Sequence, residues 1–298
     1  MTHILYNPLA DNRSGEANAK KISSIISGDE LDFIDVTALD INDFLKKTPQ
    51  QERIIISGGD GTIHYLINSL GGIVPERSIY YYPAGSGNDF KTDIRETNNE
   101  DIILLNPYIK DLPTVRVKEK ELLFLNGIGY GIDGYCCEEG DRQRSLSDRP
   151  INYTAIAIKG LLFKFSPRNA EITVDGTKHT YDHVWLAAAM NGRFYGGGMM
   201  VAPGQDRLNQ NRLVTLVVMH CPSKLKTLMA FPSIFKGEHV RHTKIVEVLT
   251  GHEITVSFDL PTPLQVDGET FSGVTTYSVR SADAGSSAEI KSAETAMQ

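Results

Sequence analysis

The chain has 298 residues, of which 41% are apolar and 22% charged, a composition that excludes a disordered or fibrous protein. No apolar run reaches the length of a membrane span, and the formal charge of −7 argues against non-specific binding to nucleic acid. We therefore expect a cytoplasmic protein, and we expect two domains because 298 residues are many for one core.

The first 112 residues alternate between strand and helix patterns. Short β-branched runs are followed by apolar residues at helical spacing, and this βαβα order predicts a parallel sheet covered by helices. Ligands of such sheets usually bind beyond the carboxyl ends of the strands. The predicted elements before the third strand are a strand at 3–7, a helix at 19–26, a strand at 31–36 and a helix at 41–45.

Two glycine-rich turns lie between a strand and a helix in this half. The first joins the strand that starts at Arg53 to a helix, and it reads Ser-Gly-Gly-Asp-Gly-Thr at 57–62. The second, within 78–90, reads Pro-Ala-Gly-Ser-Gly and precedes Asn88 and Asp89, which we expect to cap the next helix. Glycines let a polyanion approach bare backbone N–H groups at a helix N-terminus. We therefore expect phosphate to bind here.

Polar residues follow each predicted parallel strand. They are Asn7, Thr37, Ser57 and Ser86, and each taken singly is more often a turn-forming residue than a ligand contact. Together they mark one edge of the sheet as the candidate binding edge.

From about residue 113 the pattern changes to short alternating segments, which predict a mainly antiparallel β domain, a sandwich, over 113–274. Asp175-Gly176 is a hairpin signal because a tight turn needs positive φ. The residues from about 275 are candidates to return to the first domain, and 282–298 are expected to form a flexible tail. The predicted strands are 114–117, 122–126, 171–174, 185–190, 213–218 and 254–258, with helices at 152–163 and 223–235.

Several motifs together resemble one family across nearly the whole chain. They are GGDGT at 58–62, PAGSGNDF at 83–90, NGIGYGIDG at 126–134, MNGRFYGGGMMVAP at 190–203 and VDGE at 266–269. This combination resembles the diacylglycerol kinase catalytic-domain family, which includes bacterial soluble lipid kinases and sphingosine kinases. GGDG alone is shared with NAD kinases and, in similar form, with phosphofructokinases, so the first domain is expected to have their α/β fold.

The resemblance implies an ATP-dependent lipid kinase that uses Mg²⁺ and acts in a cleft between its domains. Glu269 matches the residue assigned as proton acceptor, and Asp60 is the second catalytic candidate, orienting magnesium or the acceptor. Asp267 would position Glu269 or help to hold magnesium; without the resemblance, Asp267 to Glu269 would be interpreted as an acidic turn. The candidate nucleotide-binding residues are Asn7, Thr37, Gly58, Gly59, Asp60, Gly61, Thr62, Ser86, Asn88 and Asp89.

Two departures from the family pattern concern charge. His64-Tyr65 stands where a carboxylate is usual, and Gln210-Asn211 stands where bacterial members carry the aspartate of a structural magnesium site. A neutral amide is a poor ligand for a hard cation, so we expect that site to be degraded, with Asp206 as the nearest substitute. The histidines and cysteines show no zinc spacing.

The expected partners are ATP and a lipid at a membrane surface, with no nucleic acid; a homodimer is compatible, although no residue pattern specifies it. A basic stretch around an apolar helix, at 224–244, is either a solvated face or a peripheral membrane contact. Two alternatives stay open. The protein is an NAD kinase-like enzyme, or it is a catalytically weakened module that binds lipid or nucleotide.

Overall fold

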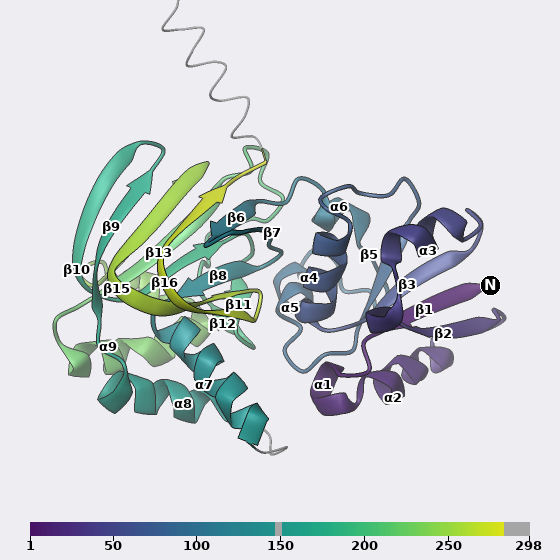
Figure 1. The fold of residues 1–298 in the computed structure, drawn as a ribbon, viewed down its shortest axis with the longest axis horizontal. Coiled ribbons are helices and arrows are strands. Elements are labelled where there is room, and N and C mark those ends of the chain that lie inside the picture. Colours follow the sequence, from purple (N-terminus) through teal and green to yellow (C-terminus); the bar gives the residue numbers. More distant parts are fainter. Residues whose placement is uncertain (147–150, 283–298) are drawn as a thin grey trace, which may run out of the picture. The chain divides into compact units, whose positions relative to one another are not determined.

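The computed structural model describes residues 1–146 and 151–282, and the chain divides into two compact units at Lys110 and Asp111. Figure 1 shows the first unit in purple to blue and the second in teal to yellow. The expected flexible tail at 282–298 lies, from residue 283, outside the described residues. No helix in the described ranges has the length and apolar character needed to cross a membrane.

The first unit is an α/β fold. In the described residues its sheet has five strands in the order β2-β1-β3-β4-β5, parallel except for β5. The elements are β1 (Thr2–Tyr6), α1 (Ala10–Arg13), α2 (Gly15–Lys20), η1 (Lys21–Ser24), β2 (Leu31–Asp35), η2 (Val36–Ala38), α3 (Ile41–Lys47), β3 (Arg53–Gly58), α4 (Asp60–Ser69), β4 (Ile79–Pro83), α5 (Asp89–Ile94), β5 (Ile103–Leu104) and α6 (Asn106–Ile109).

Both faces of this sheet are covered, which explains why its strands are apolar runs. Ile4 and Ile55 pack against Ala19 of α2 and Ile22 of η1 on one face. Because side chains alternate along a strand, Ile54 and Ile56 point to the other face, where α4 packs against β3 (Figure 1). The predicted helix at 19–26 is in fact α2 from Gly15 followed by a 3₁₀ turn.

The second unit is built on a larger antiparallel sheet. In the described residues the sheet contains nine strands, in the order β14-β13-β10-β8-β15-β16-β6-β7, with β9 pairing both β10 and β15. The elements are β6 (Thr114–Val117), β7 (Lys120–Leu123), β8 (Gly127–Tyr130), α7 (Ile132–Leu146), α8 (Tyr153–Lys159), η3 (Gly160–Lys164), β9 (Arg168–Val174), β10 (Thr177–Met190), β11 (Phe194–Tyr195), β12 (Met199–Met200), β13 (Val214–His220), α9 (Lys224–Ala230), η4 (Phe231–Lys236), η5 (Glu238–Arg241), β14 (Val246–Gly251), β15 (Glu253–Val266) and β16 (Glu269–Arg280).

Two apolar clusters hold this unit together, one on each face of the central strands. Ala187 and Ala189 of β10 belong to the core enclosed by the strands, whereas Ala188 and Met190 face the helices. Figure 1 shows α7, α8 and α9 gathered at the same end of the unit. Burial on both faces explains why β10 reads as a continuous apolar run rather than an alternating one.

The predicted fold class is confirmed, and so is the hairpin at Asp175-Gly176, where both residues have positive φ and Val174 pairs with Thr177. Two boundaries are wrong. The predicted strand at 122–126 ends at Leu123 because the backbone amides of residues 125–127 bind a side chain, described below. The residues from about 275 do not return to the first unit, since Tyr277 to Arg280 pair with β6 of the second.

Candidate functional site

The sheet edge that the sequence predicted as a binding edge is present in the first unit. Strands β2, β1, β3 and β4 run parallel, so the segments that follow them lie along one edge of the sheet. These segments carry Asn7, Thr37, the turn at 58–60 and the turn at 84–88. The side chains of Asn7 and Thr37 also close local turns: the Asn7 Oδ1 accepts from the Leu9 N–H, and the Thr37 hydroxyl donates to Asp35.

The two glycine turns pack directly on each other. A Cβ placed on Gly85 would lie 2.3 Å from the Gly59 Cα, so no side chain fits between the turns at that point. The Ala84 N–H donates to the Gly58 carbonyl oxygen over 2.8 Å, which continues the pairing of β3 and β4 into the turns. The turns therefore form one backbone platform beside the start of α4, as phosphate binding requires.

Asp60 joins these turns through its side chain. Its two carboxylate oxygens accept the backbone N–H groups of Asp89 (2.9 Å) and Phe90 (2.8 Å) at the start of α5. The sequence predicted that Asn88 and Asp89 cap α5 and that Asp60 faces magnesium or the acceptor. Asp60 caps α5 from α4, whereas the Asn88 side chain makes no capping bond to that helix, so the Asn88 cap was wrong. The role of Asp60 toward magnesium or the acceptor stays a prediction.

Asn88 shapes the second turn itself. Its φ of 49° is left-handed, its Oδ1 accepts from the Gly85 N–H over 3.1 Å, and its Nδ2 donates to the Gly85 carbonyl oxygen over 2.7 Å. Asparagine tolerates this conformation better than most residues because its short side chain bonds to nearby backbone. Ser86 stands exposed on the same turn.

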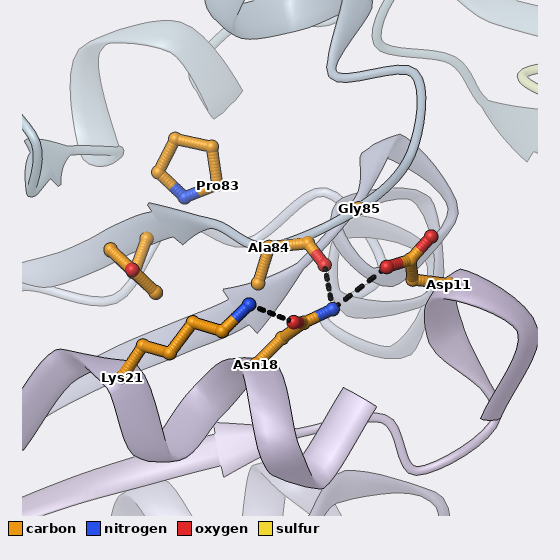
Figure 2. A pocket seen from close by; sticks show the side chains of 7 residues that line it. Asp11, Asn18, Lys21, Pro83, Ala84 and Gly85 are labelled. Atoms are coloured by element: carbon orange, nitrogen blue, oxygen red, sulfur yellow. Dashed lines mark hydrogen bonds between the residues drawn. The ribbon is translucent and has the colours of Figure 1, made fainter. Parts of the chain in front are cut away.

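An open pocket lies between this platform and α2 (Figure 2). Asn18 is central: its Nδ2 donates to the Asp11 carboxylate (2.8 Å) and to the Ala84 carbonyl oxygen (3.4 Å), and the Lys21 Nζ donates to its Oδ1 (2.7 Å). Lys21 thus places a cation beside the second turn. Sequence reasoning missed Asn18 and Lys21, because on a helix face they look like solvated residues. The pocket is lined by Asp11, Asn18, Lys21, Tyr82, Pro83, Ala84 and Gly85.

In the second unit, the motif around Glu269 is a tight hairpin turn. Val266 pairs with Glu269 across the two-residue turn of Asp267 and Gly268, which have φ values of 45° and 94°. The acidic-turn interpretation was therefore correct in geometry. The Glu269 side chain is 41% exposed, and the Lys120 ammonium lies 3.1 Å from its Oε1. Lys120 was not predicted.

The Asp267 carboxylate fixes this hairpin to the loop before β8. It accepts the N–H groups of Leu125, Asn126 (2.8 Å) and Gly127 (3.0 Å). Those amides are therefore not available to a strand ladder, which is why the predicted strand at 122–126 ends early. Asp267 was predicted either to position Glu269 or to help hold magnesium, and both roles stay predictions; its bonds to the loop are compatible with the first.

A buried arginine completes the support of the loop. Arg207 is 7% exposed, and its guanidinium donates to the Leu125 carbonyl oxygen (3.3 Å) and to the Asn126 Oδ1 (3.0 Å). The Nδ2 of Asn191 donates to the same Leu125 oxygen over 2.8 Å. Asn126 and Asn191 belong to two sequence motifs that had no assigned role. Their side chains help to fix the loop that Asp267 of the Glu269 hairpin contacts.

Asp133, at the start of α7, is a buried carboxyl group that the sequence analysis did not single out. Its Oδ2 is buried without a hydrogen-bond partner, and this burial raises the pKa of the Asp133 carboxyl to about 7. Gly129 and Gln265 are its neighbours: a Cβ on Gly129 would lie 2.9 Å from Asp133 Oδ2 and 2.9 Å from Gln265 Nε2.

In the region expected to hold a structural metal, polar side chains accept hydrogen bonds from nearby backbone N–H groups. The Asp206 Oδ1 accepts from the Leu208 N–H over 3.0 Å, and the Asn209 Oδ1 accepts from the Leu213 N–H over 2.8 Å. Across residues 1–146 and 151–282, no group of three or more histidine, cysteine, aspartate or glutamate side chains is arranged to hold a metal ion.

Two family models match the chain, one on each unit. The diacylglycerol kinase catalytic domain matches residues 1–109, and the YegS C-terminal NAD kinase beta sandwich-like domain matches residues 126–282.

Individual proteins agree with these matches. The chain is 27% identical over 217 residues to a diacylglycerol kinase of Mycobacterium tuberculosis, covering 70% of this chain and 67% of that protein. It is 28% identical over 246 residues to YtlR, a candidate lipid kinase of Bacillus subtilis, covering 73% and 74%. A solved structure of a diacylglycerol kinase from Bacillus anthracis aligns with a TM-score of 0.58 at 16% identity, over 94% of this chain and 92% of that one, which shows a shared fold.

Proposed function

This chain belongs to the diacylglycerol kinase catalytic-domain family and is a lipid kinase by that membership, and we propose that it transfers the γ-phosphoryl group of ATP to the hydroxyl of diacylglycerol or a related lipid alcohol. The observation that carries the proposal is the pair of packed glycine turns at the carboxyl edge of the parallel sheet. Backbone N–H groups there suit phosphate oxygens, and Lys21 adds a positive charge beside them.

In the proposed reaction the acceptor hydroxyl oxygen attacks the γ-phosphorus, the bond from that phosphorus to the bridging oxygen breaks, and ADP leaves. The acceptor proton passes to the Glu269 carboxylate. Phosphoryl transfer depends mainly on positioning and charge neutralisation, so the rigid support of both loops is the central contribution of the protein. Asp60 and Asp267 act as positioning residues in this scheme, because each binds backbone of a neighbouring loop.

Kinases of this kind usually use a divalent metal, and the described residues do not offer it a built set of protein ligands. The Asp267 oxygens already accept three backbone N–H groups, and Gln210 supplies no carboxylate. We therefore assign no step to a protein-bound metal, and we expect magnesium to arrive with the nucleotide phosphates.

The acceptor class is tested by incubating the protein with Mg-ATP and a panel of lipid alcohols, with NAD⁺ as a separate acceptor. Phosphorylated diacylglycerol, or another phosphorylated lipid of the panel, supports the proposal. Phosphorylated NAD⁺ with inert lipids would make the protein an NAD kinase-like enzyme. ATP binding in calorimetry without any product would make it a binding module.

Glu269→Gln tests the proton acceptor, because it removes the charge with little change of shape. We expect kcat to fall on the order of 10²–10⁴-fold, with ATP affinity and thermal stability unchanged. Glu253→Gln is the matched control, since Glu253 is an exposed β15 carboxylate that also pairs with one cation, Arg280. Equal turnover in the two variants would remove Glu269 from the mechanism.

A further inference from the structure

One end of the second unit carries exposed apolar side chains among lysines. The exposed apolar residues are Ile158 (44%), Phe163 (76%), Leu225 (66%), Met229 (66%) and Phe235 (44%). They come from α8, η3, α9 and η4, and α9 contacts both η3 and η4, so these elements form one neighbourhood (Figure 1). We call these five side chains, with the lysines described next, the lysine-rimmed face.

The charges of this face are all positive. The segments 153–164 and 224–236 contain five lysines and no aspartate or glutamate, in a chain with 37 acidic residues. All five lysines are exposed, and no ion pair of theirs occurs in the described residues. The lysines are Lys159, Lys164, Lys224, Lys226 and Lys236.

The carboxylates of the neighbouring helix α7 are already bound elsewhere. Glu139 accepts from Arg142 and Gln143 on its own helix. Glu138 and Asp141 accept from the Ser272 and Thr270 hydroxyls of β16. The pKa of Glu139 is lowered mainly by its bonds to Arg142 and Gln143 and to a smaller degree by Lys164, so this carboxylate partly balances Lys164. Lys159, Lys224, Lys226 and Lys236 carry the charge that is available to an external anion.

The exposed apolar side chains are not needed for the core of the unit. The inner faces of the same elements supply Ile156, Leu161, Phe231 and Ile234, which are at most 7% exposed and pack around Trp185. Single exposed apolar residues are common on soluble proteins, but a cluster rimmed by cations is typical of a surface that lies in a membrane interface.

We propose that the lysine-rimmed face docks on an anionic lipid bilayer, with the apolar side chains entering the headgroup boundary and the lysines binding acidic headgroups. The proposal rests on the proposed function, because a lipid alcohol substrate resides in a bilayer. The positive charge of the face attracts acidic headgroups, and a bilayer also takes up the five apolar side chains. A second copy of the chain has a net charge of −7, but it would need a matching apolar surface to cover those side chains.

The test measures partition of the full chain onto vesicles of phosphatidylcholine alone or mixed with phosphatidylglycerol, at low and high salt. We expect binding to the anionic vesicles that weakens with salt. Neutralising Lys224, Lys226 and Lys236 together with glutamine should lower the partition constant about 100-fold, since each lysine near an anionic surface contributes about 1 kcal/mol, a factor of about 5. Leu225→Ser should lower it about 10-fold.

The controls remove the same number of lysine charges, and an exposed leucine, at positions outside the lysine-rimmed face. Glutamine at the exposed Lys46, Lys47 and Lys178 matches the triple variant, and Leu260→Ser, where Leu260 is 53% exposed, matches the leucine variant. Both controls should bind vesicles like the unaltered chain. Equal loss in the controls and the face variants would overturn the proposal.

Turnover of a short-chain diacylglycerol dissolved as monomers separates this inference from the proposed function. Unchanged turnover in face variants that no longer bind vesicles supports both. Vesicle binding that depends on the face, without phosphorylation of any acceptor, supports the surface and refutes the kinase proposal. If the face variants instead dissociate a dimer in light scattering and bind vesicles normally, the face contacts a second copy and the membrane proposal is wrong.

Discussion

Asp133→Asn should remove a pH dependence of stability from the second unit. The buried Asp133 carboxyl has a pKa raised from 3.8 to about 7, so the folded state holds a proton that the unfolded chain releases near pH 4. Between about pH 4 and pH 7 the folded state binds more protons, and its stability therefore falls as pH rises. The contribution is fully present below pH 4 and is lost as pH passes about 7.

The size of the effect follows from the difference of about three pKa units. At about 1.4 kcal/mol for each unit, the unaltered chain should lose on the order of 4 kcal/mol between pH 4 and pH 8 through this group. An amide does not titrate, so the variant lacks this loss. With about 2–4 °C for each kcal/mol, the Tm of the variant relative to the unaltered chain should rise by roughly 10 °C across that range.

Trp185 makes the measurement specific to this unit. It is the single tryptophan of the chain and is 1% exposed in the core of the second unit, so its fluorescence follows the unfolding of that unit. Thermal scans between pH 4 and pH 8 would compare the chain with Asp133→Asn and with Asp182→Asn, an exposed control. Parallel Tm curves for all three proteins would show that Asp133 titrates as an ordinary carboxyl, and the reasoning from burial would be refuted.

The remaining predictions concern the glycine turns. Asp60→Ala should cost about 1–2 kcal/mol, because two N–H groups of α5 lose their acceptor, and calorimetry should show weaker ATP binding; unchanged affinity would mean that α5 does not set the phosphate site. Gly61→Val and Gly85→Ala form a matched pair. A Cβ at Gly61 meets no atom within 4 Å, so Gly61→Val should weaken ATP binding with little change in Tm, whereas Gly85→Ala should lower Tm by forcing the two turns apart. Normal ATP affinity in Gly61→Val would place phosphate elsewhere.

Local sequence patterns correctly predicted those helices, strands and turns whose formation depends on a few neighbouring residues. The strand and helix around the first glycine turn, and the hairpin at Asp175-Gly176, follow from residue spacing and from the need for positive φ. α7 was missed because Ile132–Leu146 is rich in charged residues and glycine and shows no strong apolar stripe. Pro232 explains why the predicted helix at 223–235 changes from α to 3₁₀ geometry after Ala230.

The sequence by itself determined the fold class, the alternation of strands and helices in the first unit, and the edge of its sheet at which we propose that phosphate binds, because these depend on short-range periodicity and on parallel strand direction. Only the tertiary structure decided what the polar groups contact. Asp60 binds backbone 29 and 30 residues away, and Asp267 binds backbone 140 to 142 residues away. A carboxylate has the same sequence signature whether it binds a ligand or satisfies buried N–H groups, and its use depends on which distant backbone the fold brings within hydrogen-bond distance.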